Sequence, residues 1–178
     1  IELLKKIIDK PLIELLLMRL SKSTELDSIV VATSIESEDD ELQYFVESLG
    51  FRCIRGSTQD VLSRYFDASK SIKADTIVRI TGDCPLVDSY LVDKFIQAYH
   101  QSNVDYLSNV DPYTFPDGLD IEVMSFNSLN IANKNASSVH DREHVTPYII
   151  DSNTYIKFYQ RNFKDLSEER WTVDELED

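Results

Sequence analysis

The sequence predicts an α/β protein: a three-layer Rossmann-like sandwich around a mostly parallel, mixed sheet. Three observations favour this class. Short runs rich in β-branched residues alternate with amphipathic stretches, three strand–helix units follow one another in the first half of the chain, and neither a repeat nor a long linker interrupts them. A helix-flanked parallel sheet with right-handed crossovers is the simplest structure for such a pattern. We expect residues 1–178 to form one domain.

Three amphipathic stretches predict helices in the first half, at residues 11–23, 37–49 and 60–72. Pro11 suits a first helical turn, since the N–H that it lacks would be unpaired there. Ser37 is expected to cap the second helix, with acidic residues in the first turn. The residues expected to face inward are Leu12, Leu15, Leu16, Met18, Val61, Leu62, Tyr65 and Phe66.

Strands are predicted between these helices, at residues 28–33, 51–55 and 76–81. The first and third read SIVVAT and TIVRIT, which are continuous runs without polar alternation apart from one arginine. Such runs are typical of parallel strands covered by helices on both faces.

The second half predicts helices at residues 87–101, 127–135 and 140–151, and strands at 104–108, 119–126, 155–159 and 170–173. The run LDIEVMSF at 119–126 alternates, so we expect a less buried strand that could be antiparallel. Alternation places Asp120 and Glu122 on one face of it, turned toward a cleft. The late strands could pair beside the first ones, which would make the sheet mixed.

Charge and composition exclude several classes of function. The formal net charge is −14 and no dense Lys/Arg cluster occurs, so we expect no nucleic-acid partner. The longest apolar stretch, residues 11–20, contains Glu14 and Arg19 and is too short to span a membrane. The two cysteines, Cys53 and Cys84, lie far apart, which is typical of free thiols in a reducing cytoplasm. We therefore expect a cytoplasmic protein.

Acidic residues follow two of the predicted strands, where ligands bind in open α/β sheets. Asp83 comes after TIVRITG and Asp174 after RWTV. Each aspartate on its own could equally cap a following helix. As a pair they could hold Mg²⁺, which prefers one or two carboxylates together with substrate phosphate and water. Gly82 beside Asp83 would let a ligand approach the backbone closely.

The same strand end carries a family resemblance. RITGDCPL at residues 79–86 resembles the signature of the cytidylyltransferase-like proteins of spore coat polysaccharide biosynthesis, which are similar to the sialic acid and 3-deoxy-manno-octulosonate cytidylyltransferases. Further blocks match in order: VATS at 31–34, RGS at 55–57, DVLSRY at 60–65, FPDGLDIEV at 115–123, REHVTPY at 142–148 and RWTVD at 170–174. Together they cover essentially the whole chain.

The resemblance implies an activity and a set of site residues. It implies transfer of a nucleotide, CMP from CTP, to a sugar or sugar acid with release of pyrophosphate, for polysaccharide precursors of the cell envelope. Asp83 and Asp174 would be the catalytic pair and would bind Mg²⁺. Thr33, Ser34, Ser57 and Arg79 would line the nucleotide side. Asp117, Asp120, Glu122, Arg142, Glu143 and His144 would line the sugar side, although His144 could equally be a structural hydrogen bonder.

The resemblance also implies a missing part. The family begins with a strand and a basic, glycine-containing loop that wraps the triphosphate, and the block that would carry them does not occur in these 178 residues. Without that loop, residues 1–178 would bind a nucleoside triphosphate weakly. A homodimer is possible. Two alternatives remain: a nucleotide-sugar-dependent glycosyltransferase, which usually carries Asp-x-Asp where this sequence has Asp83-Cys84-Pro85, and a non-catalytic binding module.

Overall fold

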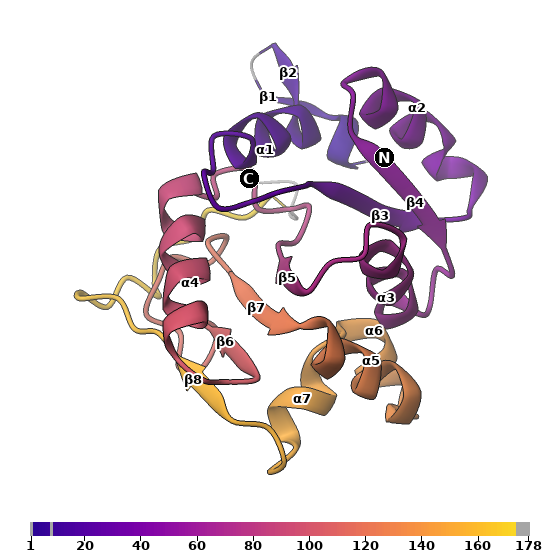
Figure 1. Ribbon diagram of the computed structural model, residues 1–178. Helices are drawn as coiled ribbons and strands as arrows, with labels where there is room; N and C mark the ends of the chain where they lie inside the picture. Colours follow the sequence, from indigo (N-terminus) through magenta and orange to yellow (C-terminus); the bar gives the residue numbers. More distant parts are fainter. Residues whose placement is uncertain (1, 8, 174–178) are drawn as a thin grey trace.

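The computed structural model describes residues 2–7 and 9–173. The first half contains η1 (Glu2–Leu4), β1 (Lys6–Ile7), β2 (Lys10–Pro11), α1 (Leu12–Leu20), β3 (Val30–Ser34), η2 (Ser37–Asp39), α2 (Asp40–Ser48), β4 (Arg52–Gly56), α3 (Val61–Ser71) and β5 (Thr76–Arg79). The second half contains α4 (Ser89–Gln101), β6 (Tyr106–Ser108), β7 (Glu122–Ser125), α5 (Phe126–Asn135), α6 (Val139–His144), α7 (Pro147–Asp151) and β8 (Lys157–Tyr159). Figure 1 shows β3, β5 and β7 in the middle of the molecule with helices around them, and the β1–β2 hairpin at its top edge.

The strands form a mixed arrangement. β3 and β4 pair in parallel, whereas the larger sheet has the order β5-β7-β6-β8. In that sheet β7 runs antiparallel to both neighbours, and β8 runs parallel to β6. A short antiparallel hairpin joins β1 to β2 ahead of α1.

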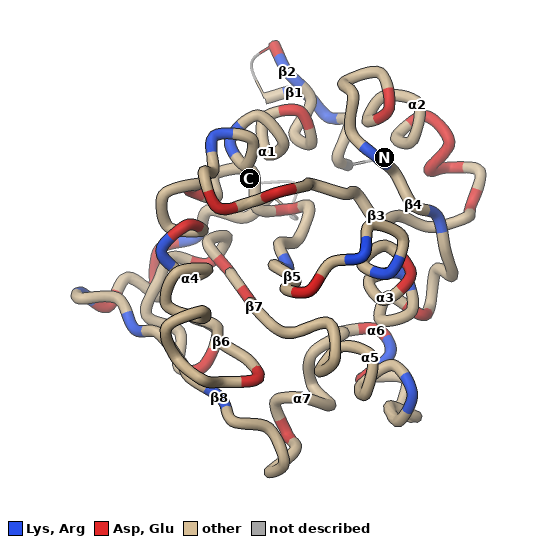
Figure 2. Tube along the Cα trace, viewed as in Figure 1, with Lys and Arg blue, Asp and Glu red and all other residues tan. Residues whose placement is uncertain are grey.

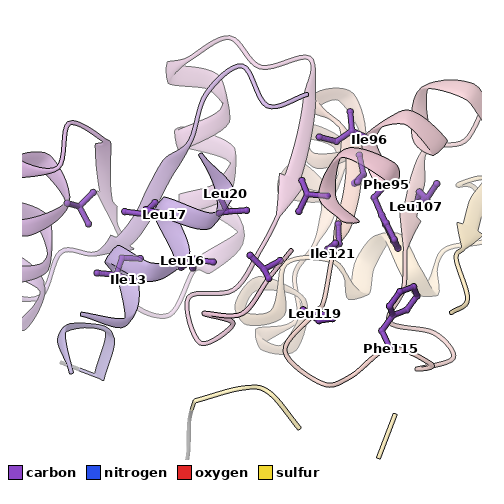
Figure 3. Packing of buried hydrophobic residues seen from close by; sticks show 14 of the residues in the cluster. Ile13, Leu16, Leu17, Leu20, Phe95, Ile96, Leu107, Phe115, Leu119 and Ile121 are labelled. Atoms are coloured by element: carbon purple, nitrogen blue, oxygen red, sulfur yellow. The ribbon is translucent and has the colours of Figure 1, made fainter. Parts of the chain in front are cut away.

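Two hydrophobic clusters lie on opposite faces of the larger sheet and produce the three layers. Leu107 and Val123 belong to one cluster, with buried residues of α1, α2 and α4. Their chain neighbours Tyr106 and Met124 belong to the other, with residues of α3, α5 and α7. Successive strand residues point to opposite faces, so a strand buried on both sides feeds two cores. Figure 3 shows the first cluster, in which side chains of α1 and α4 meet residues of the sheet.

A cavity separates the two sheets. It has a volume of about 560 Å³ and is lined by residues of β3, β5, α1 and α3. β3 pairs with β4 and β5 pairs with β7, and within the described ranges no strand pairs with the other edge of either. The lining is largely aliphatic, with Leu16, Leu17, Ile77 and Val31 among the contributing residues. Both sheets therefore present an open edge to one apolar slot.

The α/β class, the mixed sheet and the order of the predicted elements are confirmed, but several details were wrong. Met18 is 47% exposed instead of facing the core. The expected helix 140–151 is two helices, because Pro147 lacks an N–H and Val145 takes a positive φ of 74°. The strand at 119–126 is shorter and buried on both faces.

The late strands were also misplaced. β8 lies beside β6 and not beside the first strands. The predicted strand at 170–173 is reduced to an isolated bridge between Asp117 and Arg170. Both errors arise because a local sequence pattern does not determine which strands pair. Pairing depends on packing in the whole sheet.

Candidate active site

Three strand ends meet at one edge of the larger sheet. β5 ends at Arg79, β6 ends at Ser108, and the antiparallel β7 begins at Glu122. The register places Glu122 directly beside both Arg79 and Ser108. Because β7 runs the opposite way, its first residue lies where its neighbours finish, so a β7 acid reaches the carboxyl edge where α/β sheets bind ligands.

A buried ion pair fixes this edge. The Arg79 Nη1 donates to Glu122 Oε1, and the Tyr106 hydroxyl donates to Glu122 Oε2 at 2.5 Å. The Arg79 guanidinium also lies over the ring of Tyr65, 5.7 Å from its centre. Burial by itself would lower the pKa of Arg79, but the charge of Glu122 outweighs burial and raises it. Both charges are therefore kept in a largely dry environment.

The prediction that Glu122 faces a cleft, which was based on the alternating pattern of residues 119–126, is wrong. The Glu122 side chain is 3% exposed and both carboxylate oxygens are already bound. It does not face an open cleft, because α3 and α5 cover the face of β7 to which it belongs. Arg79, expected on the nucleotide side, is likewise committed to this pair and is 17% exposed.

Asp120 lies next to this pair in a cluster of like charges. Its pKa is raised to about 6, chiefly by burial, then by the negative charges of Asp117 and Glu122, with a smaller effect from Asp83. Arg79 opposes these effects. Two of the aspartates that the sequence assigned to metal and sugar binding, Asp83 and Asp117, thus act electrostatically on a third, Asp120.

This raised pKa predicts a pH-dependent stability. Asp120 has its ordinary pKa of 3.8 in the unfolded chain and about 6 in the folded protein. The folded state therefore binds the proton more tightly, so stability is lost as the pH rises from 3.8 through 6. We expect Asp120→Asn to stabilise the protein by about 1–2 kcal/mol at pH 8, and by almost nothing at pH 4. Urea unfolding at the two pH values measures this; an equal gain at both would contradict it.

The last described segment of the chain crosses this cluster. The Val173 N–H donates to the main-chain oxygen of Asp83 at 3.0 Å, and the Trp171 N–H donates to that of Asp117 at 2.7 Å. Gly118 permits the approach: its φ is +100°, and a Cβ there would lie 2.6 Å from the carbonyl carbon of Trp171. Only glycine fits such a backbone crossing.

The expected partner of Asp83, Asp174, lies outside the described residues. Its predecessor Val173 is nevertheless bonded to Asp83. Asp83 is partly buried, and its carboxylate accepts from the Cys84 thiol, with Sγ and Oδ1 3.6 Å apart. Burial raises the pKa of the Cys84 thiol to about 12, so the thiol is neutral near pH 7. The carboxylate of Asp83 is an oxygen donor of the kind that Mg²⁺ prefers.

A complete metal site is not assembled by side chains alone. Among residues 2–7 and 9–173 no three His, Cys, Asp or Glu side chains come together as a metal-binding group. Mg²⁺ commonly binds one or two carboxylates and takes its other ligands from phosphate and water. The oxygen environment of Asp83 fits that mode of binding.

The residues expected on the nucleotide side lie at the ends of β3 and β4. The hydroxyls of Thr33 and Ser34 both donate to Asp39, with the Thr33 bond at 2.6 Å. Burial alone would raise the pKa of Asp39, but these hydrogen bonds and the charge of Arg55 hold it below its usual value. Ser57, just after β4, is exposed and accepts from the Asp60 N–H at 3.2 Å.

Three expected sugar-side residues lie on α6, beside α3. Arg142 donates to both oxygens of Asp60 and to the carbonyl and side-chain oxygens of Asn133. Four of its N–H bonds are thus engaged in joining three helices. Glu143 and His144 are exposed, and the His144 ring lies 4.5 Å from that of His140. In the described part of the chain, no hydrogen bond or ion pair joins Arg142, Glu143 or His144 to Asp117 or Asp120.

Sequence reasoning missed several residues of this edge. Tyr65 and Tyr106 were interpreted as core or left unassigned, yet both contact the Arg79–Glu122 pair. Asp39 was taken for a solvated acid of a helix start. Arg64 was quoted only as part of the DVLSRY block, which was the one available signal for it.

Comparison with known proteins places this geometry in a family. The family described as "Cytidylyltransferase" matches residues 3–174. The chain belongs to the cytidylyltransferase family. An uncharacterized protein, MJ1063 of Methanocaldococcus jannaschii, is 42% identical over 180 residues, covering 99% of this chain and 73% of that protein. The spore coat polysaccharide biosynthesis protein SpsF of Bacillus subtilis is 33% identical, covering 94% of this chain and 72% of that protein.

Solved structures agree with membership of the cytidylyltransferase family. A cytidylyltransferase from Leptospira borgpetersenii superposes with a TM-score of 0.95 at 32% identity, covering 99% of this chain and 76% of that one. A CMP:2-keto-3-deoxy-manno-octonic acid synthetase, solved with CTP, gives a TM-score of 0.69 at 13% identity over 90% of this chain and 83% of that one. The second likeness shows a shared fold alone.

Two further observations concern the whole chain. Acidic residues are spread over many elements of the cytidylyltransferase fold, and no basic patch dominates the view in Figure 2. Over the described ranges, no helix is both long and apolar enough to cross a membrane.

Proposed function

We propose that this chain is the catalytic domain of an enzyme that transfers CMP from CTP to a sugar or sugar acid in polysaccharide precursor synthesis. One observation carries the proposal beyond family membership: the bond from Val173 to Asp83, which joins the chain just before Asp174 to the strand-end acid. The SpsF relative is named for polysaccharide biosynthesis, and the octonic acid synthetase was solved with CTP, which supports both substrates.

The proposed reaction is an in-line displacement at the α-phosphorus. A sugar hydroxyl oxygen forms the new bond to phosphorus, the bond to pyrophosphate breaks, and the hydroxyl proton is released. Asp83 and Asp174 would hold Mg²⁺, which when bound neutralises charge on the phosphate oxygens. The chain's own residues position the reactants, which is the main task in such transfers. Asp117 and Asp120 would orient sugar hydroxyls; Thr33, Ser34 and Ser57 lie at the strand ends proposed for the nucleotide.

A pyrophosphate-release assay tests the proposal. Full-length protein would be incubated with CTP, Mg²⁺ and a panel of sugars and sugar acids, with UTP and ATP as nucleotide controls. We expect acceptor-dependent pyrophosphate release with CTP. Transfer from a nucleotide sugar without pyrophosphate release would indicate a glycosyltransferase instead, and CTP binding without turnover would indicate a binding module. Pro85 occupies the second position after the strand-end acid Asp83, where an Asp-x-Asp motif would carry its second aspartate, and this speaks against the glycosyltransferase pattern.

We propose further that the slot between β3 and β5 takes a strand from outside these 178 residues. Both facing strand edges are open, the lining is apolar, and a quarter or more of each curated relative lies beyond the matched part. β3 has five residues, so about five residues at roughly 3.3 Å each would complete the ladder. The loop after such a strand would emerge at the carboxyl edge beside Thr33 and Asp83.

This arrangement predicts a difference in nucleotide affinity. We expect the 178-residue chain to bind CTP at least about tenfold more weakly than a chain that carries its upstream sequence, because a few charge-assisted contacts to phosphate account for that difference. Calorimetric titration of both proteins with CTP and Mg²⁺ measures it. Equal affinity would show that no upstream segment contributes to the site.

A further inference from the structure

Arg64 is a cation for which residues 2–7 and 9–173 provide no hydrogen-bond acceptor or counter-ion. Its Nε is buried from solvent and makes no hydrogen bond, and in the described part of the chain no ion pair involves its guanidinium. The Nε of Arg79 is also unpaired, but that guanidinium has Glu122 as its counter-ion. Since the chain has 32 acidic residues, the isolation of Arg64 is not due to a shortage of carboxylates.

The local structure explains why no acid reaches it. Asp60 stands four residues earlier, the usual spacing for an ion pair on a helix. Its side chain instead caps α3 by accepting from the Ser63 N–H and binds Arg142 through both oxygens. Burial alone would raise the pKa of Asp60, but these bonds lower it, so the carboxylate stays ionised and occupied.

Gly56 fixes where Arg64 lies. A Cβ at residue 56 would stand 2.6 Å from the Cγ of Arg64, so the side-chain stem occupies the space that glycine leaves open. Gly56 is the last residue of β4, and Ser57 follows it. The stem therefore lies against the carboxyl end of a strand, at the edge where the nucleotide side is proposed.

We propose that Arg64 binds the phosphate groups of the nucleoside triphosphate. The inference rests on the proposed function and adds a residue to it. A guanidinium presents paired N–H donors that match phosphate oxygens, and such charge-assisted bonds are strong when partly buried. The phosphate would be the counter-ion of the Arg64 guanidinium. Gly56 leaves room for the Arg64 stem, and Arg142 binds Asp60, so that Asp60 does not pair with Arg64.

Titration calorimetry of full-length variants tests this proposal. We expect Arg64→Gln to weaken CTP binding by about 10–100-fold, the range for one or two bonds to a charged group, and to leave cytidine binding unchanged. Arg64→Lys should recover part of the lost CTP affinity, since lysine keeps the positive charge but lacks the paired N–H donors of a guanidinium. Gly56→Ala should weaken CTP binding too, because the stem must move. Arg52→Gln is the matched control, since Arg52 is exposed at the opposite end of β4.

Thermal unfolding distinguishes binding from a structural role. A structural arginine would lower Tm when removed, whereas Arg64→Gln should leave Tm unchanged or higher, because it breaks no hydrogen bond or ion pair in the described part of the chain and removes a buried, unbonded Nε. Equal CTP affinity in Arg64→Gln and wild type overturns the proposal, as does an equal loss for cytidine. Should wild-type protein bind no nucleotide, the proposed function fails, and inorganic pyrophosphate becomes the probe: equal affinity of wild type and Arg64→Gln for pyrophosphate then overturns the role of Arg64 separately.

Discussion

Replacing Asp83 by asparagine is expected to lower kcat by about 10²-fold or more while leaving the KM for CTP within a few-fold of wild type. Asparagine keeps the size of the side chain but removes the charge that a divalent cation requires. Removing one electrostatic stabiliser of a transition state costs on this scale. The loss falls on kcat because a bound cation stabilises the charge that develops on the oxygen of the leaving pyrophosphate in the transition state. Steady-state kinetics at saturating Mg²⁺ in the full-length protein would measure it.

Asp88→Asn is a matched control for this prediction. Asp88 lies five positions further on and caps α4 by accepting from Tyr90 N at 2.8 Å. Asparagine caps helices as well as aspartate does, so this variant should keep both stability and turnover. Normal kcat in Asp83→Asn would refute its metal role and, with it, the proposed reaction class.

The Glu122→Ala variant is expected to lose about 3–5 kcal/mol of stability, the range for breaking a buried ion pair from one side. The carboxylate holds Arg79 and Tyr106 together, and its removal leaves the Arg79 guanidinium buried without a counter-charge. Urea denaturation at pH 7 would measure the change. The effect should greatly exceed that of Tyr106→Phe, which removes one hydrogen bond and costs about 1 kcal/mol.

A double variant separates the ion pair from simple packing. Replacing both partners, as Arg79→Met with Glu122→Leu, removes the two charges together and should restore most of the stability lost in Glu122→Ala. If the double variant were as unstable as the sum of the single changes, the charges would not be coupled. Activity would then still distinguish a catalytic contribution of Arg79, since the double variant lacks its charge.

Hydrophobic periodicity predicted most helices and strands, because the local sequence patterns agree with the secondary structure that the fold contains. The helix expected at residues 60–72 is α3, and the strands expected at 28–33 and 76–81 are β3 and β5. The partners of strands were less predictable. Nothing in the run 119–126 says that β7 would lie between β5 and β6 and be covered on both faces, and this error moved Glu122 from a cleft to the interior.

The candidate site was predictable in its residue types and less so in its contacts. The strand-end rule and the family blocks found Asp83, Asp117 and Asp120, and the charges of the first two raise the pKa of Asp120. The contacts of Arg142 could not be foreseen, since they join α3, α5 and α6, which are distant in sequence. Arg64 escaped notice for the opposite reason: its significance lies in having no partner, which no pattern of residues displays.

The slot between the sheets also bears on how this polypeptide behaves in concentrated solution. β3 and β5 each offer a row of main-chain donors and acceptors along an open edge, and the side chains that line the slot are largely apolar. Open edges are templates for pairing with strands of other molecules. A preparation restricted to these 178 residues should consequently self-associate through this slot. A short peptide with the sequence of the strand proposed to fill the slot, added in trans, should prevent this association by pairing with both β3 and β5.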